Sequence, residues 1–468
     1  MKKKARILRR MKTFVETGVD EINKKIGKLA LFYLHYHSMK GSILLKFASV
    51  CLLLTAAWTV KAQPVKVEIV KNDSGFVLMR NHKPYFIKGA GGTNYIDRLA
   101  KYGGNSMRTW STSNGDQDLA KADNLGLTVT MGLDVARERH GFNYDDTTAV
   151  RQQLEKLRLE VIKYRNYPAL LMWGVGNELN LNYKNPKVWD AVNEIAKMIH
   201  QEDPYHPVTT MLAGVNPEVV KAVIARCPDL DLLAVQVYGG LAKVPEQIGR
   251  AGWKKAYIVT EWGPTGHWES AITPWKAAIE ETSSEKAEVY KKRYEASIKV
   301  DKNCVGSYVF LWGQKQERTP TWYGLFTEAG EESEVIDVMQ YLWTGKWPDN
   351  RAPHLDSVML DGKRAISFIY LQPGKTYPVN VYVKDQDHDL LTARWELLPE
   401  STDLKNGGDR ESRPQAIPGL ITVSQTDSAT LKAPDKAGAY RLFLYVSDGK
   451  NKVATGNIPF LVGNPSQK

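Results

Sequence analysis

The sequence predicts a (β/α)8 barrel followed by an immunoglobulin-like β-sandwich. Between Tyr85 and Leu342, short apolar runs alternate with segments of helical character, which is the pattern of repeated βα units around a parallel sheet. After Asn350 the helical periodicity stops, and strand-like segments separated by turn residues follow. A chain of 468 residues also has room for a barrel of about 250 residues and a smaller second domain.

Eight apolar runs are the candidate barrel strands. Each has the length of a strand and is apolar throughout, as expected for a strand that is buried on both faces. The runs begin at Tyr85, Asn105, Leu127, Ala169, His206, Leu232, Ala256 and Cys304. Between them, Asn185-Pro186 and Asn216-Pro217 each place a capping side chain before a first-turn proline and predict a helix start. A last helix near residues 332–342 is expected to close the barrel.

Segments at the two ends complete the predicted architecture. Residues 64–84 predict a hairpin that turns at Asn72–Gly75 and caps the barrel floor. In the second domain, strands are predicted near residues 365–370, 377–383, 393–397, 419–423 and 440–446. The expected organisation is an N-terminal extension and signal peptide at 1–62, a barrel at 63–350 and a sandwich at 351–468.

The basic charge is concentrated at the start of the chain. Residues 1–62 carry 13 Lys or Arg against 3 Asp or Glu, so most of the net charge of +11 comes from this segment. Met39-Lys40 and the apolar run from Phe47 to Val60, with small residues before Gln63, have the layout of a secretory signal peptide cleaved after Ala62. The apolar run is shorter than the roughly 20 residues of a membrane span, although a single-pass anchor is the alternative.

This layout predicts export to the periplasm, the cell surface or the medium, with no stable membrane span and no nucleic-acid partner. Cys227 and Cys304 are expected to be buried thiols, because two cysteines do not make a disulfide scaffold and neither has a metal-type partner. Asp385, Asp387 and Asp389 imitate a calcium loop, but Leu390 replaces the required glycine, and a hairpin turn is the preferred interpretation. No metal and no cofactor are expected.

Two glutamates end apolar runs at positions where catalytic groups of barrel enzymes lie. The fourth run ends in Asn177-Glu178, and the seventh ends in Thr260-Glu261-Trp262-Gly263. The C-terminal ends of all barrel strands meet at one mouth, so these carboxylates are expected to face each other there. A buried ion pair is the alternative for either glutamate alone.

Such a pair matches the needs of glycosidic bond cleavage. One carboxylic acid protonates the departing oxygen while the other carboxylate attacks the anomeric carbon, and a separation of about 5 Å gives retention of configuration. The acid must keep its proton near neutral pH, which requires an environment that raises its pKa. The sequence therefore predicts a retaining mechanism.

Asn-Glu after the fourth run and Thr-Glu-Trp-Gly after the seventh resemble the motifs of clan A glycoside hydrolases, over roughly residues 64–345. The segment from Tyr167 to Glu178 resembles the family 2 catalytic domain, but no sugar-binding sandwich precedes this barrel. A barrel followed directly by one immunoglobulin-like domain is more similar to glycoside hydrolase family 158, whose activity is endo-β-1,3-glucanase on laminarin-type glucans. The resemblance implies that Glu178 is the acid/base and Glu261 the nucleophile.

The same resemblance implies roles for residues around the pair. Asn177 would bind the sugar hydroxyl next to the reacting carbon, Arg108 and Tyr238 would donate to Glu261, and Trp312 would form the floor under the cleaved ring. For these, a rim salt bridge, a core tyrosine and simple packing are the respective alternatives. Stacking on sugars or packing in the core are both open for the loop aromatics Trp110, Trp262, Trp268, Trp322 and Tyr323, and Asp134 is expected near the cleft without a defined role.

The leading hypothesis is thus a retaining hydrolase of internal β-1,3-glucosidic bonds that binds a polysaccharide or oligosaccharide. An exo-acting β-glycosidase of the family 2 kind, such as a galactosidase or glucuronidase, is one alternative. A carbohydrate-binding protein without catalysis is the other.

Overall fold

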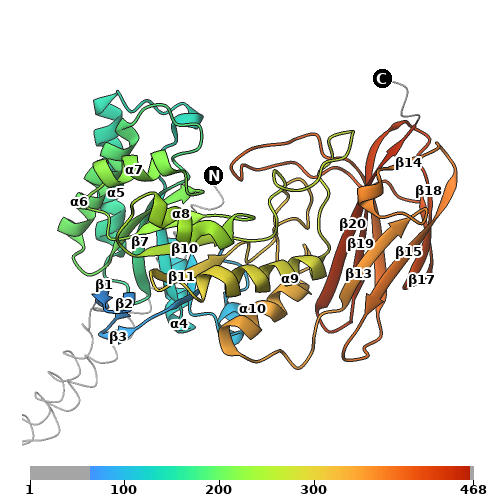
Figure 1. Ribbon diagram of the computed structural model, residues 1–468, viewed down its shortest axis with the longest axis horizontal. Helices are drawn as coiled ribbons and strands as arrows, with labels where there is room; N and C mark the ends of the chain where they lie inside the picture. Colours follow the sequence, from blue (N-terminus) through green and yellow to red (C-terminus); the bar gives the residue numbers. More distant parts are fainter. Residues whose placement is uncertain (1–63, 464–468) are drawn as a thin grey trace, which may run out of the picture. The chain divides into compact units, whose positions relative to one another are not determined.

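The computed structural model describes residues 64–463, and within them eight parallel strands close into a barrel (Figure 1). All eight apolar runs predicted from the sequence are strands of this barrel, so the predicted fold class is confirmed. In chain order they are β4 (Ile87–Gly91), β5 (Ser106–Arg108), β6 (Thr128–Leu133), β7 (Leu170–Asn177), β8 (Val208–Ala213), β9 (Leu233–Gln236), β10 (Tyr257–Trp262) and β11 (Cys304–Val309). The barrel closes by parallel pairing of β11 with β4.

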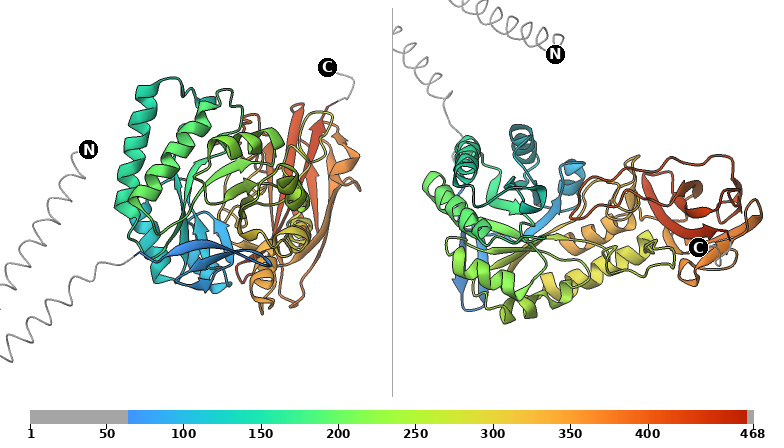
Figure 2. Two further views of the ribbon diagram at one scale, coloured as in Figure 1. Left: turned by 60° about the vertical axis from the view of Figure 1, so that its left-hand side comes forward. Right: turned by 90° about the horizontal axis from the view of Figure 1, so that it is seen from above.

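Helices surround these strands (Figure 2). They are α3 (Ile96–Lys101), α4 (Gly115–Asn124), α5 (Thr147–Tyr164), α6 (Lys187–Glu202), α7 (Pro217–Arg226), α8 (Val244–Arg250), α9 (Ser283–Arg293) and α10 (Glu334–Thr344). Asn216 caps α7 as predicted, because its side chain accepts from the N–H groups of Glu218 and Val219. The Asn185 side chain also caps its helix as predicted, since its Oδ1 accepts from the N–H of Lys187, the first residue of α6.

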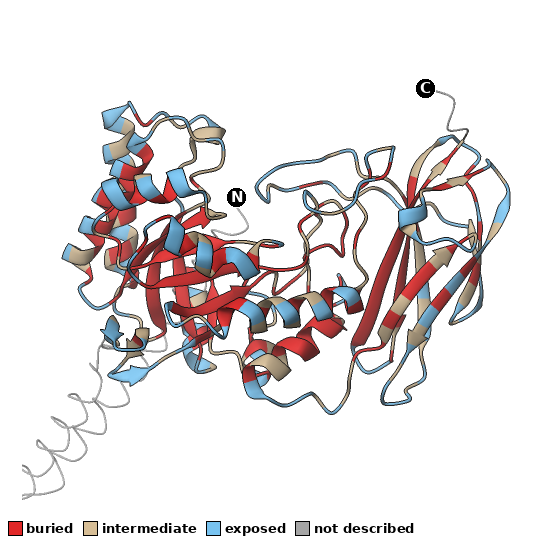
Figure 3. Cartoon of the chain, viewed as in Figure 1, coloured by how far each residue is buried: buried red, intermediate tan, exposed pale blue. Residues whose placement is uncertain are grey.

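The barrel strands are buried on both faces, as their apolar sequences require (Figure 3). One core lies between the strands and the helices, and a second lies inside the barrel at the end opposite the mouth. The second core includes Val67 and Leu78 from a three-stranded sheet of β1 (Val67–Asn72), β2 (Gly75–Arg80) and β3 (Lys83–Pro84). The predicted hairpin therefore caps the barrel floor, with Asn72 paired to Gly75 at its turn.

The second domain consists of two facing sheets around their own core, one antiparallel and the other mixed. One contains β13 (His354–Leu360), β15 (Thr376–Lys384), β17 (Ile421–Gln425) and β18 (Ser428–Lys432), and the other contains β14 (Ile369–Leu371), β16 (Thr392–Pro399), β19 (Gly438–Ser447) and β20 (Lys452–Val462). The sequence analysis missed β13, β18 and β20. It also placed a strand at 365–370, where a short 3-10 turn at Ala365–Ser367 precedes β14.

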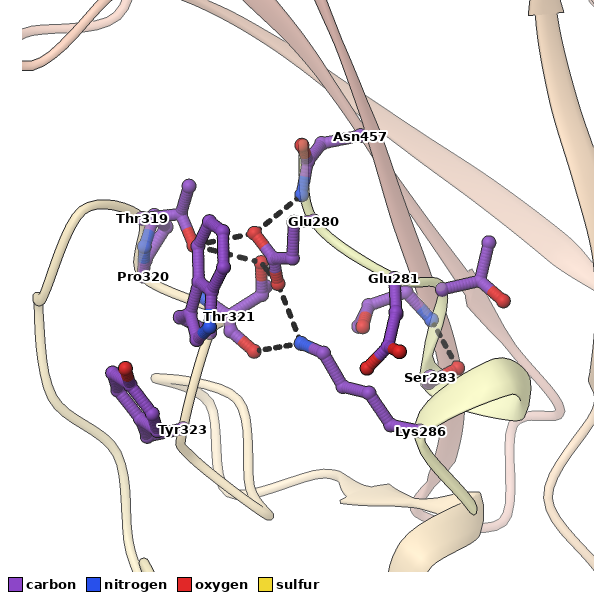
Figure 4. Close-up of polar contacts among 12 residues, drawn as sticks. Glu280, Glu281, Ser283, Lys286, Thr319, Pro320, Thr321, Tyr323 and Asn457 are labelled. Atoms are coloured by element: carbon purple, nitrogen blue, oxygen red, sulfur yellow. Dashed lines mark hydrogen bonds and ion pairs between the residues drawn. The ribbon is translucent and has the colours of Figure 1, made fainter. Parts of the chain in front are cut away.

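The barrel and the sandwich share a sheet and a buried polar network. β12 (Glu332–Ser333), just before α10, pairs in parallel with β20 of the sandwich. Figure 4 shows the network around Glu280, whose carboxylate accepts from Lys286 Nζ and Asn457 Nδ2, both at 2.6 Å. Thr319 and Thr321 hydroxyls donate to the same carboxylate at 2.6 and 2.8 Å. Asn457 belongs to β20, so the network ties the sandwich to the loops around the barrel mouth.

Asp385, Asp387 and Asp389 lie in the connection from β15 to β16, and their carboxylates are within 4.8 Å of one another. β15 and β16 belong to different sheets, so the predicted hairpin turn is wrong and the segment is a crossover. Asp385 Oδ1 accepts from the N–H groups of Asp387 and Asp389, and Lys450 forms an ion pair with Asp389. These contacts stabilise the crossover itself.

The remaining expectations concern export, membrane spans and the two cysteines. The predicted signal peptide lies outside the described residues, so export stays a prediction. Within residues 64–463, no helix is both long enough and apolar enough to cross a membrane. Cys227 and Cys304 are buried and unpaired, as expected.

Candidate active site

Glu178 and Glu261 open into one cavity at the barrel mouth. Glu178 directly follows β7, the fourth strand, and Glu261 lies near the end of β10, the seventh. Both residues line a cavity of about 840 Å³, together with Asn177 and Tyr238. The structure thus brings together the two carboxylates that the sequence singled out.

Two donors hold the Glu261 carboxylate. Tyr238 Oη donates to Oε1 at 2.8 Å, and Arg108 Nη1 donates to Oε2 at 3.1 Å. Arg108 and Tyr238 are buried, and burial together with the nearby Glu261 charge raises the pKa of Tyr238 well above its usual range. The phenol therefore remains a donor at any working pH, and both contacts stabilise and orient the charged form of Glu261.

A continuous set of hydrogen bonds joins the two carboxyl groups. The other terminal nitrogen of the Arg108 guanidinium, Nη2, donates to Asn177 Oδ1. The Gln236 side chain lies between the two glutamates. In the orientation that satisfies both ends of its amide, it donates to Glu178 Oε1 at 2.6 Å and accepts from Arg108 at 2.8 and 3.0 Å. Arg108 and Gln236 thus fix the relative placement of Glu178 and Glu261.

Glu178 is held as the acid of the pair. Burial, reinforced by the nearby charge of Glu261, raises its pKa from 4.5 to about 8, against the opposing effect of Arg108. Its backbone has a φ of +54°, a region that non-glycine residues seldom adopt, and its N–H donates to Met211 O of β8 at 2.9 Å. Glu178 therefore carries a proton at neutral pH and has a fixed position at the rim.

The aromatic residues divide into those that line the cavity and those that pack behind it. Trp110 and Trp268 line the cavity, and Trp268 is 57% exposed, so both are available to a sugar face. Phe310, at the end of the eighth strand, also lines it. The Arg108 guanidinium lies over the Trp110 ring, 5.0 Å from its centroid, which fixes that ring at the edge of the site.

The structure contradicts the cavity roles considered for Trp262 and Trp312, and the alternative of packing holds for both. Both are fully buried: Trp262 packs on Tyr290 and Tyr294, and Trp312 packs on Phe326 and donates to Tyr95 O. Successive strand side chains point to opposite faces, so Glu261 faces the cavity and Trp262 faces the helices. Phe310 lines the cavity, whereas Trp312 lies past the end of β11 at Val309 and packs behind the cavity.

Three further residues from the sequence analysis lie outside the cavity lining. Trp322 and Tyr323 are buried, and Tyr323 packs edge-on against Tyr238. Asp134 is exposed and forms an ion pair with Arg137 at 3.7 Å. Each contacts a residue of the cavity: Tyr323 contacts Tyr238, Trp322 contacts His267 and Asp134 contacts Arg137.

Several residues that the sequence analysis did not name also line the cavity. Apart from Gln236, they come from loops after the strands, and include Arg137, Arg139, His267, Lys315 and Glu317. Four more, Asn406, Gly407, Gly408 and Asp409, belong to the sandwich. Gln236 ends the sixth apolar run and could have been found by the rule that located Glu178 and Glu261. No local signal in the sequence marks the others.

Glu317 and His267 form an ionisable pair beside the two glutamates. Burial raises the pKa of Glu317, while Lys315, at 2.7 Å, opposes this effect. Burial, with the nearby Arg318 charge, lowers the pKa of His267 to about 4. His267 is therefore neutral at neutral pH, and its Nε2 lies 3.7 Å from Glu317 Oε1.

No protein-family model matches the chain, and no curated protein matches it. Solved structures similar to it include β-glucuronidase 2 of Bacteroides uniformis, at 16% identity and a TM-score of 0.48, covering 85% of this chain and 48% of that protein. The β-glucuronidase of Ruminococcus gnavus has 14% identity and a TM-score of 0.47, covering 61% and 53%. That of Dictyoglomus thermophilum has 18% identity and a TM-score of 0.46, covering 60% and 54%.

This chain therefore spans about half the length of the solved structures to which it is similar. Identities of this size do not carry an activity from one protein to another.

Proposed function

We propose that this protein is a retaining β-glycoside hydrolase. In the first step, Glu178 gives its proton to the glycosidic oxygen while Glu261 attacks the anomeric carbon; the C–O bond breaks and a covalent glycosyl-enzyme forms. In the second step, the Glu178 carboxylate takes a proton from water, whose oxygen displaces Glu261 from the sugar. Glu178 regains its proton, and the sugar leaves with its configuration retained.

One observation carries this proposal: of the two carboxyl groups that line one cavity, one has a raised pKa and the other accepts hydrogen bonds from a cation and a phenol. Glu178 has a pKa raised to about 8, whereas Glu261 accepts two hydrogen bonds from Tyr238 and the Arg108 cation. One neutral acid beside one charged nucleophile is the arrangement that double displacement requires. Asn177, held by Arg108 at the rim, is placed to bind a sugar hydroxyl.

The decisive experiment replaces the nucleophile. Glu261→Gln should lower kcat on any β-glycoside substrate by a factor on the order of 10⁴ or more, because no covalent intermediate can form. Glu246→Gln, the same change at an exposed site on α8, is the matched control and should leave kcat unaltered. Full turnover in Glu261→Gln would overturn the proposal. A wild-type protein that binds glycans but cleaves none would instead favour the carbohydrate-binding alternative.

Two substrate classes are candidates. The motif resemblance favours internal β-1,3-glucosidic bonds of laminarin-type glucans. The second candidate is exo-acting hydrolysis of the family 2 kind, and the specific observation in its favour is that four residues of the sandwich line the cavity and close it on one side. The similar solved structures named above are also β-glucuronidases by name.

Product analysis separates these candidates. Laminarin, lichenan, cello-oligosaccharides and chromogenic monosaccharide glycosides would be incubated with the same enzyme. A ladder of oligosaccharides from laminarin favours internal cleavage. Rapid release from the monosaccharide glycosides, with single sugars as the only product of the polymers, favours exo action.

A further inference from the structure

The sandwich takes part in the barrel mouth through one long loop. This loop, residues 400–420, joins β16 to β17 and reaches from the sandwich towards the barrel (Figure 1). Its segment Asn406–Asp409 lines the same cavity as Glu178 and Glu261. The wall of the candidate active site is therefore built by both domains.

A salt bridge and a hydrogen bond anchor this loop to two separate sides of the mouth. Asp409 pairs with Arg139, from the segment after β6, at 3.0 Å. The preceding residue is Gly408, whose backbone carbonyl accepts from Lys315 Nζ at 2.8 Å. Lys315 lies in the segment after β11. β6 and β11 are separated in the barrel by β4 and β5, so consecutive loop residues bridge the gap above these two strands.

A buried ion pair fixes the base of the loop. The Glu411 side chain is fully buried and pairs with Arg318 at 2.7 Å, and it also accepts from the N–H groups of Arg318 and Lys405. Arg318 follows β11, in the segment whose Thr319 and Thr321 contact Glu280 (Figure 4). The loop thus rests on the same network that fastens the sandwich to the barrel.

Two glycines let the loop approach the cavity closely. Gly407 and Gly408 have φ values of +62° and +72°, where side chains are strained. A Cβ on Gly407 would lie 2.9 Å from Arg139 Nη2 and 3.2 Å from Leu181 Cδ1. The two loop residues at the cavity therefore present backbone without side chains, and the exposed side chain of Asn406 lies beside them.

The charges of this wall are paired internally. Arg139 faces Asp409, Lys315 faces Glu317, and Arg137 faces Asp134. The cations that line the described cavity are thereby matched by carboxylates. Such a wall offers amide and peptide hydrogen bonds to hydroxyl groups, and no unmatched cation for the carboxylate of an acidic sugar.

We propose that the segment Ser401–Arg413 of this loop closes one end of the substrate cleft and binds the terminal sugars of a glycan there. The enzyme therefore acts on the ends of neutral β-linked glycan chains. This inference rests on the proposed glycosidase function and adds to it the mode of attack and the charge of the substrate. Gly214, Trp268 and Glu269 also line the cavity and follow β8 and β10, strands whose ends this loop does not bridge, so the remainder of the chain is expected to leave the cavity there.

The test compares the wild-type protein with a variant in which residues 404–410 are replaced by Gly-Ser-Gly, which keeps Glu411. On end-labelled laminari-oligosaccharides, the wild type should release products of one fixed size from one end. The shortened variant should cut at internal bonds and lower the viscosity of laminarin faster for the same number of bonds broken. A folded variant with the wild-type product pattern would overturn the proposal.

Point variants decide the question if the shortened loop prevents folding. Asn406→Ala should lower the ratio of kcat/KM on oligosaccharides to kcat/KM on aryl glycosides by roughly 3–10-fold, the usual effect of one neutral hydrogen bond. Asn406→Trp, which fills the cavity edge, should lower this ratio further. Leu390→Ala, at an exposed position in another sandwich loop, is the matched control. Unchanged ratios in both Asn406 variants would contradict a binding role for the loop.

Three further outcomes are informative. Faster hydrolysis of an aryl β-glucuronide than of the aryl β-glucoside and β-galactoside would overturn the assignment to neutral sugars. A wild-type protein that hydrolyses no β-glycoside would refute the proposed function itself. A wild type that hydrolyses polymers internally, with no response to the loop variants, would refute this inference alone.

Discussion

Glu178 at the barrel mouth and Glu280 at the joint with the sandwich are both glutamates whose pKa burial pushes upward, but they have opposite protonation states. At Glu178, burial and the neighbouring Glu261 raise the pKa to about 8. At Glu280, burial acts in the same upward direction, but Lys286, the Thr319 hydroxyl and the Arg441 charge outweigh it and the pKa is lowered. The difference lies in the partners: Glu280 has a cation and three further donors, whereas Glu178 has one amide and a like charge.

This comparison separates a functional carboxyl group from a structural one. A fully satisfied buried carboxylate holds two domains together and has no capacity left for a substrate. An incompletely satisfied one costs stability but keeps a proton that it can transfer. The same substitution, Glu to Gln, should therefore have opposite consequences at the two positions.

The largest effect is expected for catalysis in Glu178→Gln. Loss of the general acid should lower kcat by about 10²–10⁴-fold on glycosides with poor leaving groups. The loss should be smaller on aryl glycosides with acidic phenols, which leave without protonation. Steady-state kinetics on the two substrate types checks this, and equal losses on both would argue against an acid role for Glu178.

The pH profile gives an independent readout of the same residue. Because the acid form of Glu178 is required and its pKa is about 8, kcat/KM of the wild type should fall as pH rises through this value. Glu178→Gln has no proton to lose, so its residual activity should lack this alkaline limb. An unchanged limb in the variant would assign it to another group.

The next effect in size is on stability, in Glu280→Gln. This change leaves Lys286 buried without its counter-charge, which should cost about 3–5 kcal/mol of unfolding free energy. Urea unfolding measures this cost, and kcat per folded molecule should stay within a few-fold of the wild type. A large fall in kcat without a loss of stability would place Glu280 in the catalytic machinery and remove the contrast with Glu178.

Tyr238→Phe should have an intermediate effect on the chemistry. It deletes one of the two donors to Glu261 and keeps the ring that packs against Trp268 and Tyr323. A hydrogen bond to a charged group contributes about 1.5–3 kcal/mol, which corresponds to a loss of about 10–150-fold in kcat/KM. Tyr257→Phe, on the same strand as Glu261 but bonded to Asp301, is the control. Equal kinetics of Tyr238→Phe and wild type would contradict the positioning role.

The smallest effect concerns the pH dependence of stability. The folded-state pKa of Glu178, about 8, lies above its usual value of 4.5, so the folded protein keeps this proton over a range where the unfolded chain loses it. The contribution of the group to stability is therefore present below about pH 4.5 and is lost as pH rises towards 8. Glu178→Gln should gain melting temperature relative to wild type between pH 5 and 8. A constant difference across this range would contradict the raised pKa.

The barrel was predictable from the sequence because its strands are buried on both faces and read as unbroken apolar runs. The sandwich strands were harder to find. β20 contains Gly456, Asn457 and Pro459, residues that ordinarily argue against a strand, and only its partners in the folded domain override this. β18 has five residues and no strong apolar pattern.

The candidate site divides in the same way. Glu178 and Glu261 end apolar runs, so a rule about strand ends was sufficient to find them. Trp262 was misplaced because a list of residues near strand ends does not specify which face a side chain points to. Trp312 was misplaced because it lies past the end of β11, where the strand pattern no longer applies. Asn406–Asp409 could not be predicted at all, since more than 130 residues of sequence separate them from Glu261 and only the docking of the sandwich brings them together.

The pairing of β12 with β20 has a consequence for cooperativity. Removing the sandwich would expose the backbone of Glu332–Ser333 as an unpaired edge and would strip the buried carboxylates of Asp337 and Glu332 of Lys452, their shared cation. An isolated barrel would therefore start from a damaged core and an aggregation-prone edge. Heat should melt residues 64–463 in a single calorimetric transition. The barrel and the sandwich therefore form a single unit for evolution and for protein engineering, and neither is a part that can be exchanged alone.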